Sequence, residues 1–547
     1  MPGPFFSRFL RQGTDGCAPV GRRQLFRRGA LAALAGSLSA KGLSAAGQLR
    51  YGSGIYESLG VRPVINCMGT FTIIGGSLML PEVKRAMEDA SRHYVHLDEL
   101  MDAVGKRLAE LTGAEWGIVT AGCAAALTHA TAASIAGCDP EKLQRLPYLA
   151  GLKSEVIMPR YSRNVYDHAV RMLGVRIVEV NTIEECEQAF NEKTAMVMIL
   201  AGGGDNGPLG VAPVSKIARR KGVPLLVDAA AEHLVIPNPH LARGADMVGY
   251  SGGKCIRGPQ CAGLLLGRKN LLKAAWIHSA PHHAFGRSMK VGKEEIVGML
   301  AAVEHWVKRD HEAEWKRWES WLEVIASRVR KIDGVATEVL QPGGLSNRSP
   351  RLRIKWDADR LGITGAELEK LARDGDPRII LGGSTGNRRA RGESSVTIMP
   401  YMMNPEDAEV VAGRLHALLS NPPRTEAAAP VGPAAQIAGQ WDLHLEFVLG
   451  GADHSLVFEQ QGADLVGTHT GDILSGELRG YVEANRVVFR SSHRYEGTRL
   501  NYEFEGDVDG AAMRGVVGLG EYGQAQWQAK RHRYGIPGGP IRPVKNI

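Results

Sequence analysis

Two short stretches carry side chains that could act together on a carbonyl compound. Lys254 is a single amine among glycines in "YSGGKCIRGPQCAGLLLG". A lysine in such a loop can form an imine with a carbonyl group if its amine faces a pocket. Asp228 comes 26 residues earlier, directly after the apolar run "PLLV". An aspartate at the end of a buried strand could pair with a protonated ring nitrogen.

A third stretch could bind a phosphate group. "GIVTAGCAAALTHAT" is typical of a strand, a turn at Gly122, Cys123 and Ala124, and the start of a helix. Backbone N–H groups at a helix N-terminus bind anions. Together, the three stretches predict a site for pyridoxal 5'-phosphate. Taken singly, each also suits a structural role, as a solvated lysine, a helix-capping aspartate or a close helix–strand contact.

The elements that must position these residues follow an alternating pattern from about residue 55 to residue 420. Short apolar runs such as "EVIMP", "RIVEV" and "AMVMIL" are separated by amphipathic stretches such as "VSKIARRKG". This pattern predicts an α/β fold with a mostly parallel sheet covered by helices on both faces. Ligands of such sheets bind at the carboxyl ends of the strands. We place this large domain at 47–310 and a small α+β domain at 311–420, joined by one long helical segment through 294–332.

The C-terminal part of the chain has a different pattern. A Pro/Ala-rich stretch at 421–436 indicates a linker. Residues 437–534 then alternate with a period of two and contain about eight short strands, which predicts a closed antiparallel β-barrel. Trp441 and Arg531 resemble the tryptophan–arginine closure of lipocalin-like barrels. Residues 535–547 form a tail.

The N-terminus and the composition bear on location and partners. Residues 1–46, with Arg22 and Arg23 before a weakly apolar run, resemble a twin-arginine export signal, so we expect a periplasmic or extracellular protein. If this segment is only a basic extension, the protein is cytoplasmic. No other run reaches about 18 apolar residues, so no membrane span is expected. The net charge of +8 is spread out, which disfavours a nucleic-acid partner. The seven cysteines show no metal-binding spacing, so we expect free thiols and no metal.

From about 55 to 420 the chain resembles the selenocysteine synthase (seryl-tRNA selenium transferase) branch of fold type I pyridoxal-phosphate enzymes. This branch also contains proteins like D-glucosaminate-6-phosphate ammonia lyase. The matching stretches are "RPVINCMGT", "ELTGAEWGIVTAGCAAAL", "VRIVEVNT", "PLLVDAA", "YSGGKCIRGPQCAGLLLGRK", "GRSMKVGKEEIVGMLAAVE" and "GDPRI".

The resemblance implies a role for each candidate residue. Lys254 would be the Schiff-base lysine, and Asp228 would face the ring nitrogen. Tyr166 or His168 could stack on the ring, although core or capping roles also suit them. Asn206 or its neighbour Asp205 could reach the ring hydroxyl, or act only as turn formers. The remaining assignments are phosphate binding by Gly122, Cys123, Ala124 and Ser251, and substrate-anion binding by Arg257, Arg287 and Lys290, where structural roles remain open.

The resemblance also bears on the reaction. We expect a lyase that performs α,β-elimination on a small anionic amino acid or amino-sugar acid, acting as a homodimer or larger oligomer. A selenium transferase or an aminotransferase is the alternative, but an exported enzyme would not meet a charged tRNA. A second alternative is a non-catalytic protein that binds a ligand through the barrel. In that case His454, His469 and His493, on predicted strands, could gather into a metal site.

Overall fold

The computed structural model describes residues 49–387, 392–423 and 432–534. The chain divides into two compact units, Met1–Val64 and Ile65–Ile547. The first unit contains the 3-10 turn η1 (Glu57–Leu59), and everything below concerns the second. The expected export signal at 1–46, part of the linker and the expected tail lie outside the described residues. No helix among the described residues has the length and apolar character needed to cross a membrane.

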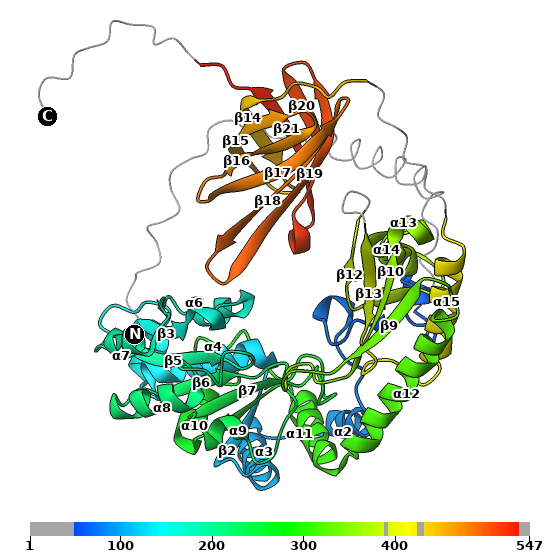
Figure 1. The fold of residues 1–547 in the computed structure, drawn as a ribbon. Helices are drawn as coiled ribbons and strands as arrows, with labels where there is room; N and C mark the ends of the chain where they lie inside the picture. Colours follow the sequence, from blue (N-terminus) through cyan, green and yellow to red (C-terminus); the bar gives the residue numbers. More distant parts are fainter. Residues whose placement is uncertain (1–48, 388–391, 424–431, 535–547) are drawn as a thin grey trace, which may run out of the picture. The chain divides into compact units, whose positions relative to one another are not determined.

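A seven-stranded sheet forms the centre of the large domain (Figure 1). Its order is β2-β8-β7-β6-β5-β3-β4, and only β8 runs antiparallel to its neighbours. The predicted mostly parallel sheet is therefore confirmed. The strands are β2 (Trp116–Thr120), β3 (Glu155–Pro159), β4 (Arg176–Val180), β5 (Thr194–Leu200), β6 (Leu225–Asp228), β7 (Met247–Ser251) and β8 (Gly263–Gly267).

The strands β2, β3, β6 and β8 are buried along their whole length, because helices pack on both faces of the sheet. The helix α4 (Gly122–Ala136) is made almost entirely of small or apolar residues, which allows it to lie buried beside β7 and β8. A Cβ atom at Gly263 would come within 2.4 Å of the carbonyl carbon of Gly122. Glycine at 263 therefore lets β8 pass directly against the start of α4. The other helices of this domain are α2 (Pro81–Ser91), α3 (Leu97–Thr112), α5 (Pro140–Arg145), α6 (His168–Arg171), α7 (Ile183–Ala189), α8 (Val211–Arg220), α9 (Pro239–Ala242), α10 (Lys269–Ile277) and α11 (Lys293–Lys308).

The small α+β domain has its own apolar core and an antiparallel sheet of order β12-β13-β10-β9. A short parallel pair joins this core, formed by β1 (Ile65–Cys67) and β11 (Ile379–Leu381). Residues 65–67 thus pack with the small domain, although they precede the large one in sequence. The other elements are α12 (His311–Val329), β9 (Val335–Leu340), β10 (Arg351–Asp357), α13 (Ala358–Leu361), α14 (Gly365–Asp374), β12 (Ser384–Thr385), β13 (Glu393–Ile398) and α15 (Asp407–Ser420).

The expected long helical segment through 294–332 is two helices, so that expectation was wrong. Arg309, directly after α11, has extended backbone angles and ends the helix. The side chain of Asp310 then accepts a hydrogen bond from the backbone N–H of Ala313 (2.9 Å) and caps α12. An aspartate in this position satisfies a free N–H at the start of a new helix, which favours the break.

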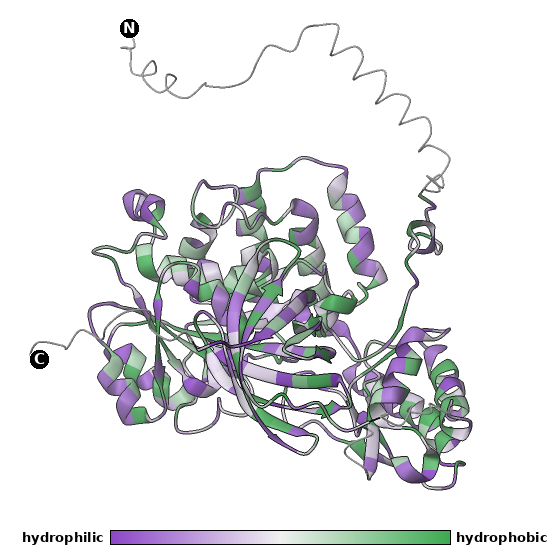
Figure 2. Ribbon diagram, turned by 90° about the horizontal axis from the view of Figure 1, so that it is seen from above, coloured by the Kyte–Doolittle hydropathy of each residue, from purple (hydrophilic) through white to green (hydrophobic). Residues whose placement is uncertain are grey.

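Eight antiparallel strands form a closed barrel in the C-terminal region, as predicted. Buried and exposed residues alternate along them, and hydrophobic and hydrophilic residues alternate along single elements (Figure 2). The first and last strands pair with Trp441 opposite Arg531, whose guanidinium lies 4.8 Å from the Trp441 ring and donates hydrogen bonds to the carbonyls of Ala438 and Gln436. The strands are β14 (Gly439–Glu446), β15 (Gly451–Gln461), β16 (Asp464–Thr470), β17 (Ser475–Glu483), β18 (Arg486–Tyr495), β19 (Thr498–Asp509), β20 (Ala512–Gly518) and β21 (Gln524–Arg531).

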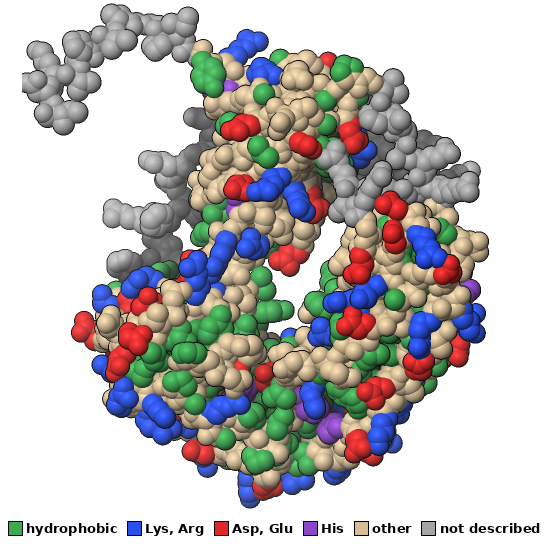
Figure 3. Space-filling view, in the orientation of Figure 1, with side chains coloured by type: hydrophobic (Ala, Val, Ile, Leu, Met, Phe, Trp, Pro, Cys, Tyr) green, Lys and Arg blue, Asp and Glu red, His purple; other side chains and the backbone are tan. Residues whose placement is uncertain are grey.

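Charged side chains of both signs are interspersed on the face of the molecule shown in Figure 3. The net charge of +8 is therefore not gathered into one basic patch on this face.

Candidate active site

A cavity of about 530 Å³ lies where β6, β7 and the start of α4 meet. All three stretches singled out in the sequence supply its walls, with Asp228 after β6, Lys254 after β7 and Gly122 at the head of α4. The predicted phosphate ligands Cys123, Ala124 and Ser251 line it as well. Residues far apart in sequence thus meet at the carboxyl ends of parallel strands, where ligands of such sheets bind.

Asp228 is the last residue of β6, and its side chain is only 2% exposed. Its Oδ1 accepts a hydrogen bond from the backbone N–H of Ala230 (3.1 Å) and a weak one from the thiol of Cys123 (3.7 Å). Burial raises the pKa of Asp228, while the Ala230 N–H and the charge of Lys254 act in the opposite direction. A carboxylate that is buried with so few hydrogen-bond donors would be stabilised by a ligand that places a cationic N–H beside it in the cavity.

Lys254 lies in a tight loop that is held by backbone hydrogen bonds between its own residues. The N–H of Gly252 donates to the carbonyl of Ala262, and the N–H of Gly258 donates to the carbonyl of Gly252, both at 2.8 Å. A Cβ atom at Gly253 would lie 2.9 Å from the Cα atom of Gln260, so a larger residue would displace the loop. The Lys254 amine donates no hydrogen bond to any described residue, and it lines the cavity. The loop therefore fixes the backbone while the amine remains available.

The start of α4 has no side-chain cap and lies beside the cavity. Its N-cap residue, Ala121, offers no side-chain acceptor, and Gly122 has a φ of 84° that suits glycine. The first N–H groups of this 15-residue helix are therefore free of a side-chain cap beside the cavity. Burial raises the pKa of the Cys123 thiol, so the neutral form of this side chain is favoured at the cavity wall. An uncapped helix start, a buried carboxylate and an unpaired amine on one cavity fit pyridoxal phosphate.

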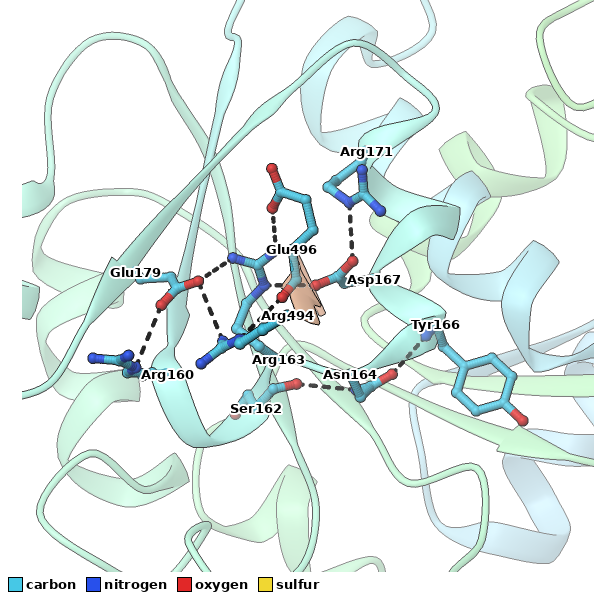
Figure 4. Close-up of polar contacts among 10 residues, drawn as sticks. All are labelled: Arg160, Ser162, Arg163, Asn164, Tyr166, Asp167, Arg171, Glu179, Arg494 and Glu496. Atoms are coloured by element: carbon cyan, nitrogen blue, oxygen red, sulfur yellow. Dashed lines mark hydrogen bonds and ion pairs between the residues drawn. The ribbon is translucent and has the colours of Figure 1, made fainter. Parts of the chain in front are cut away.

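Tyr166 lines the cavity and is held by its own loop (Figure 4). The side-chain oxygen of Asn164 accepts a hydrogen bond from the backbone N–H of Tyr166 (2.7 Å), and the Tyr166 ring points away from the charged network behind it. His168 is exposed and does not line the cavity. Of the two stacking candidates, only Tyr166 is therefore placed beside the space for the ring.

The charged network behind Tyr166 is centred on two buried side chains, Arg163 and Asp167. The side chain of Arg163 is 3% exposed and pairs with the fully buried Asp167 at 2.5 Å, and Arg171 pairs with the same carboxylate at 3.0 Å. Arg163 also pairs with Glu179 and with Glu496, which lies in the turn between β18 and β19 (Figure 4). Several ion pairs thus hold this loop in place.

The other predicted site residues lie outside the cavity. The amide of Asn206 donates to the carboxylate of Asp205 at 3.0 Å. Arg287 and Lys290 are exposed. Their assignments to cofactor and substrate binding stay predictions.

Arg257 lines a smaller cavity of about 220 Å³, and its Nε donates to the carbonyl of Leu78 at 2.8 Å. His233 lines the same space with its ring 4.5 Å from that of Trp306, and burial lowers the pKa of His233 to about 4. Arg257 therefore lines a different cavity from the one that contains Lys254.

Sequence reasoning missed several residues that line the larger cavity. Gln260 and Cys261 do so and follow Lys254 within the same motif, so their position in sequence could have identified them. Thr72 begins the 3-10 turn η2 (Thr72–Ile74), Met79 lies in the loop before α2 and Met87 lies in α2, and no chemical pattern distinguishes them.

The three barrel histidines named from the sequence do come together. His454 Nδ1 lies 2.9 Å from His469 Nε2, and His469 Nδ1 lies 2.7 Å from the hydroxyl of Ser491 and 3.2 Å from His493 Nε2. Both nitrogens of His469 are thus engaged by neighbours. Burial lowers its pKa to about 3, so the ring is neutral.

Comparisons with known proteins agree with this geometry. The aminotransferase class-V family matches residues 91–290. D-glucosaminate-6-phosphate ammonia lyase of Salmonella typhimurium is 32% identical over 59% of this chain and 88% of that protein. A 5'-C-glycyluridine monooxygenase-decarboxylase of Streptomyces is 31% identical over 66% of this chain and 92% of that protein.

Two further similarities extend the comparison. L-seryl-tRNA(Sec) selenium transferase of Proteus mirabilis is 25% identical over 44% of this chain and 56% of that protein. A solved structure of D-glucosaminate-6-phosphate ammonia-lyase superposes with a TM-score of 0.59 and 30% identity, covering 67% of this chain and 98% of that one.

Proposed function

Because the chain belongs to the class-V aminotransferase family of pyridoxal-phosphate enzymes, related to D-glucosaminate-6-phosphate ammonia lyase and selenium transferase, we propose that it is an ammonia-releasing lyase. The proposed substrate is a small anionic amino acid or amino-sugar acid. The observation that carries the proposal is the meeting of Lys254, Asp228 and the uncapped start of α4 on one cavity.

When bound, pyridoxal phosphate draws electrons away from the bonds at the amine-bearing carbon of a substrate. The N–H groups at the start of α4 and the side chain of Ser251 would hold the phosphate, and Tyr166 would cover the ring. Asp228 would keep a proton on the ring nitrogen, because a buried carboxylate stabilises a neighbouring cation. Lys254 would hold the cofactor covalently through Nζ.

Lys254 is also the general base of the proposed reaction. Once its amine is free, it can accept the proton of the substrate's α-carbon. The resulting ammonium can give a proton to the β-substituent that leaves. No other lysine, and no histidine, glutamate or arginine, lines the 530 Å³ cavity within the described residues, so we assign both proton transfers to Lys254.

The comparisons suggest two other reactions that the same residues could support. The Streptomyces relative, which this chain matches over 92% of that protein's length, is named a monooxygenase-decarboxylase. Transfer of the amine to a 2-oxo acid would make the protein an aminotransferase. Each outcome releases a different product, so one set of assays separates them.

The test is a substrate panel with purified full-length protein and added cofactor. The panel holds amino-sugar acids with and without a phosphate group and small anionic amino acids. Ammonia and 2-oxo acid formed in equal amounts support the lyase. Carbon dioxide release with oxygen uptake supports the decarboxylase, and amine transfer to an added 2-oxo acid supports the aminotransferase. Lys254→Ala is the control for each assay.

Export and self-association are also part of this proposal. A fractionation experiment with Arg22→Lys and Arg23→Lys tests the first, since loss of the pair should retain the protein in the cytoplasm. Sedimentation of the protein tests the expected homodimer, and a single-chain mass for the active species would contradict it.

A further inference from the structure

A second cluster of buried polar residues lies outside the cavity that holds Lys254. Asp205 follows β5, Glu232 follows β6, and His240 belongs to the short helix α9. Their side chains are 4%, 4% and 1% exposed. One donor atom from each lies within 4.8 Å of the other two, and none of the three lines the cavity.

The hydrogen bonds of His240 leave one of its nitrogens unused. Nε2 lies 2.7 Å from a Glu232 carboxylate oxygen, so this nitrogen carries the hydrogen and donates it. Nδ1 is buried and has no hydrogen-bond partner. Asp205 Oδ2 lies 3.7 Å from Nδ1, which is too far for a hydrogen bond. His240 Nδ1 and this carboxylate oxygen therefore lie near each other with no hydrogen bond between them.

This arrangement is the one that a metal ion stabilises. Histidine nitrogens and carboxylate oxygens bind zinc at about 2.0–2.2 Å, so one ion can contact two donors whose separation is 3.7 Å. Metal-binding histidines usually donate their other N–H to a carboxylate, which fixes the tautomer and the ring orientation. Glu232 occupies that place behind His240.

We propose that His240 Nδ1 and Asp205 Oδ2 bind a divalent transition-metal ion, with Glu232 orienting His240 and water completing the coordination. A set of one imidazole and nearby carboxylates suits zinc and similar ions better than calcium or magnesium. Glu232 follows Asp228 by four residues in the same loop, so the ion would brace the segment that carries the proposed ring partner.

The other groups around the cluster define the competing explanation. Arg243 lies 3.5 Å from the same oxygen of Asp205, the amide of Asn206 donates to the other oxygen, and Asn238 accepts from the His240 backbone N–H. A protonated His240 and Arg243 together could balance the two carboxylates without a metal. Arg243 is 37% exposed and can turn toward solvent, which leaves the oxygen free for an ion.

The experiment measures zinc bound to the full-length holoenzyme after dialysis against zinc, by elemental analysis and by titration. Cobalt replaces zinc in a parallel sample, because its absorption reports the donor set. The variants are His240→Ala, Asp205→Asn, Glu232→Gln and Arg243→Ala. His469→Asn is the matched control, since it removes an equally buried histidine from the barrel cluster.

The proposal expects one ion per chain that is lost in His240→Ala and Asp205→Asn and kept in His469→Asn. Glu232→Gln should weaken binding by about 10- to 100-fold. Arg243→Ala removes a competing charge at a partly exposed position, so it should fold and should bind zinc more tightly than the natural protein. Lys254→Ala should keep the ion, which separates this test from the fate of the proposed lyase.

Two results would overturn the proposal. One is a natural protein that holds no zinc after dialysis, together with an Arg243→Ala variant that holds none either. The other is bound zinc that disappears in His469→Asn and persists in His240→Ala, because the ion would then belong to the barrel.

Discussion

The cavity of the large domain and the interior of the barrel both bury polar side chains, but they differ in how those side chains are bonded. In the barrel, His469 contacts His454, His493 and Ser491, so its ring is satisfied from inside the fold. In the cavity, Asp228 receives only one N–H and a weak thiol donor, and Lys254 donates no hydrogen bond to a described residue. Buried groups with unused bonding capacity beside open space indicate a ligand site, whereas satisfied groups indicate structure.

The largest expected effect is at Lys254. Lys254→Ala removes both the covalent link and the general base, so turnover should fall by about 10⁴-fold or more. The visible absorbance of the bound cofactor should vanish with it. Lys316→Ala, at a lysine that is 71% exposed on α12, is the control and should keep both. Retained turnover in Lys254→Ala would place the chemistry elsewhere.

The next effect is at Asp228. Asp228→Asn keeps the shape but removes the carboxylate that would hold the ring proton, so turnover should fall about 10³-fold with little change in cofactor binding. An unchanged turnover would show that Asp228 does not face the ring.

The same substitution should act on stability in the opposite direction. Burial raises the pKa of Asp228, so the folded protein without cofactor binds this proton more tightly than the unfolded chain does. Stability is therefore lost as the pH rises from the ordinary aspartate value through the raised one. Asparagine avoids this loss, and thermal unfolding of the cofactor-free variant at neutral pH should show a gain of about 1 kcal/mol. A destabilised variant would contradict this reasoning.

A third expected effect concerns the loop behind Tyr166. Asp167→Asn leaves Arg163 buried with one partner fewer, and breaking a buried ion pair costs about 3 kcal/mol. The loop should open, so cofactor affinity should fall while residual turnover at saturating cofactor persists. Titration with cofactor measures this, and Asp139→Asn, an exposed helix cap in the same domain, should leave the affinity unchanged.

The smallest expected effect is a loss of barrel stability at acid pH that the region around the cavity should not share. Burial lowers the pKa of His469 to about 3, and His454 and His493 shift in the same direction. These histidines bind protons more weakly in the folded barrel than in the unfolded chain. The free energy of unfolding of the barrel therefore falls as the pH drops below 6.5, the ordinary pKa of histidine. The loss is at most about 1.4 kcal/mol per histidine and pH unit. Hydrogen exchange of barrel peptides between pH 7 and pH 4 should detect this loss of stability. Equal acid sensitivity in the peptides around Lys254 would contradict the expected difference between the barrel and the cavity.

Much of the candidate site could be predicted from the sequence, because its key residues lie in recognisable local patterns. Glycines on both sides mark Lys254 as a loop residue, and the apolar run before Asp228 marks it as the end of a strand. The small residues after Gly122 mark it as the start of a buried helix. Each pattern predicts its own backbone, and the parallel sheet brings the three strand ends together. The eight-stranded barrel followed in the same way from its period of two.

What the sequence did not predict depends on long-range contacts or side-chain directions. The pairing of β1 with β11 joins segments about three hundred residues apart, which no local period encodes. His168 begins α6 and Asn206 lies in a turn, and tertiary packing rather than residue type sets the direction of both side chains, so their proposed roles stay predictions. The break between α11 and α12 was visible in principle, because Asp310 precedes the helix that it caps.

A chemical experiment tests the proposed imine itself. The holoprotein is reduced with borohydride, digested, and mapped by mass spectrometry for the reduced cofactor. We expect the added mass on the peptide that contains Lys254 and on no other lysine. An unmodified Lys254, in protein that has bound the cofactor, would refute the covalent link on which the proposed chemistry depends.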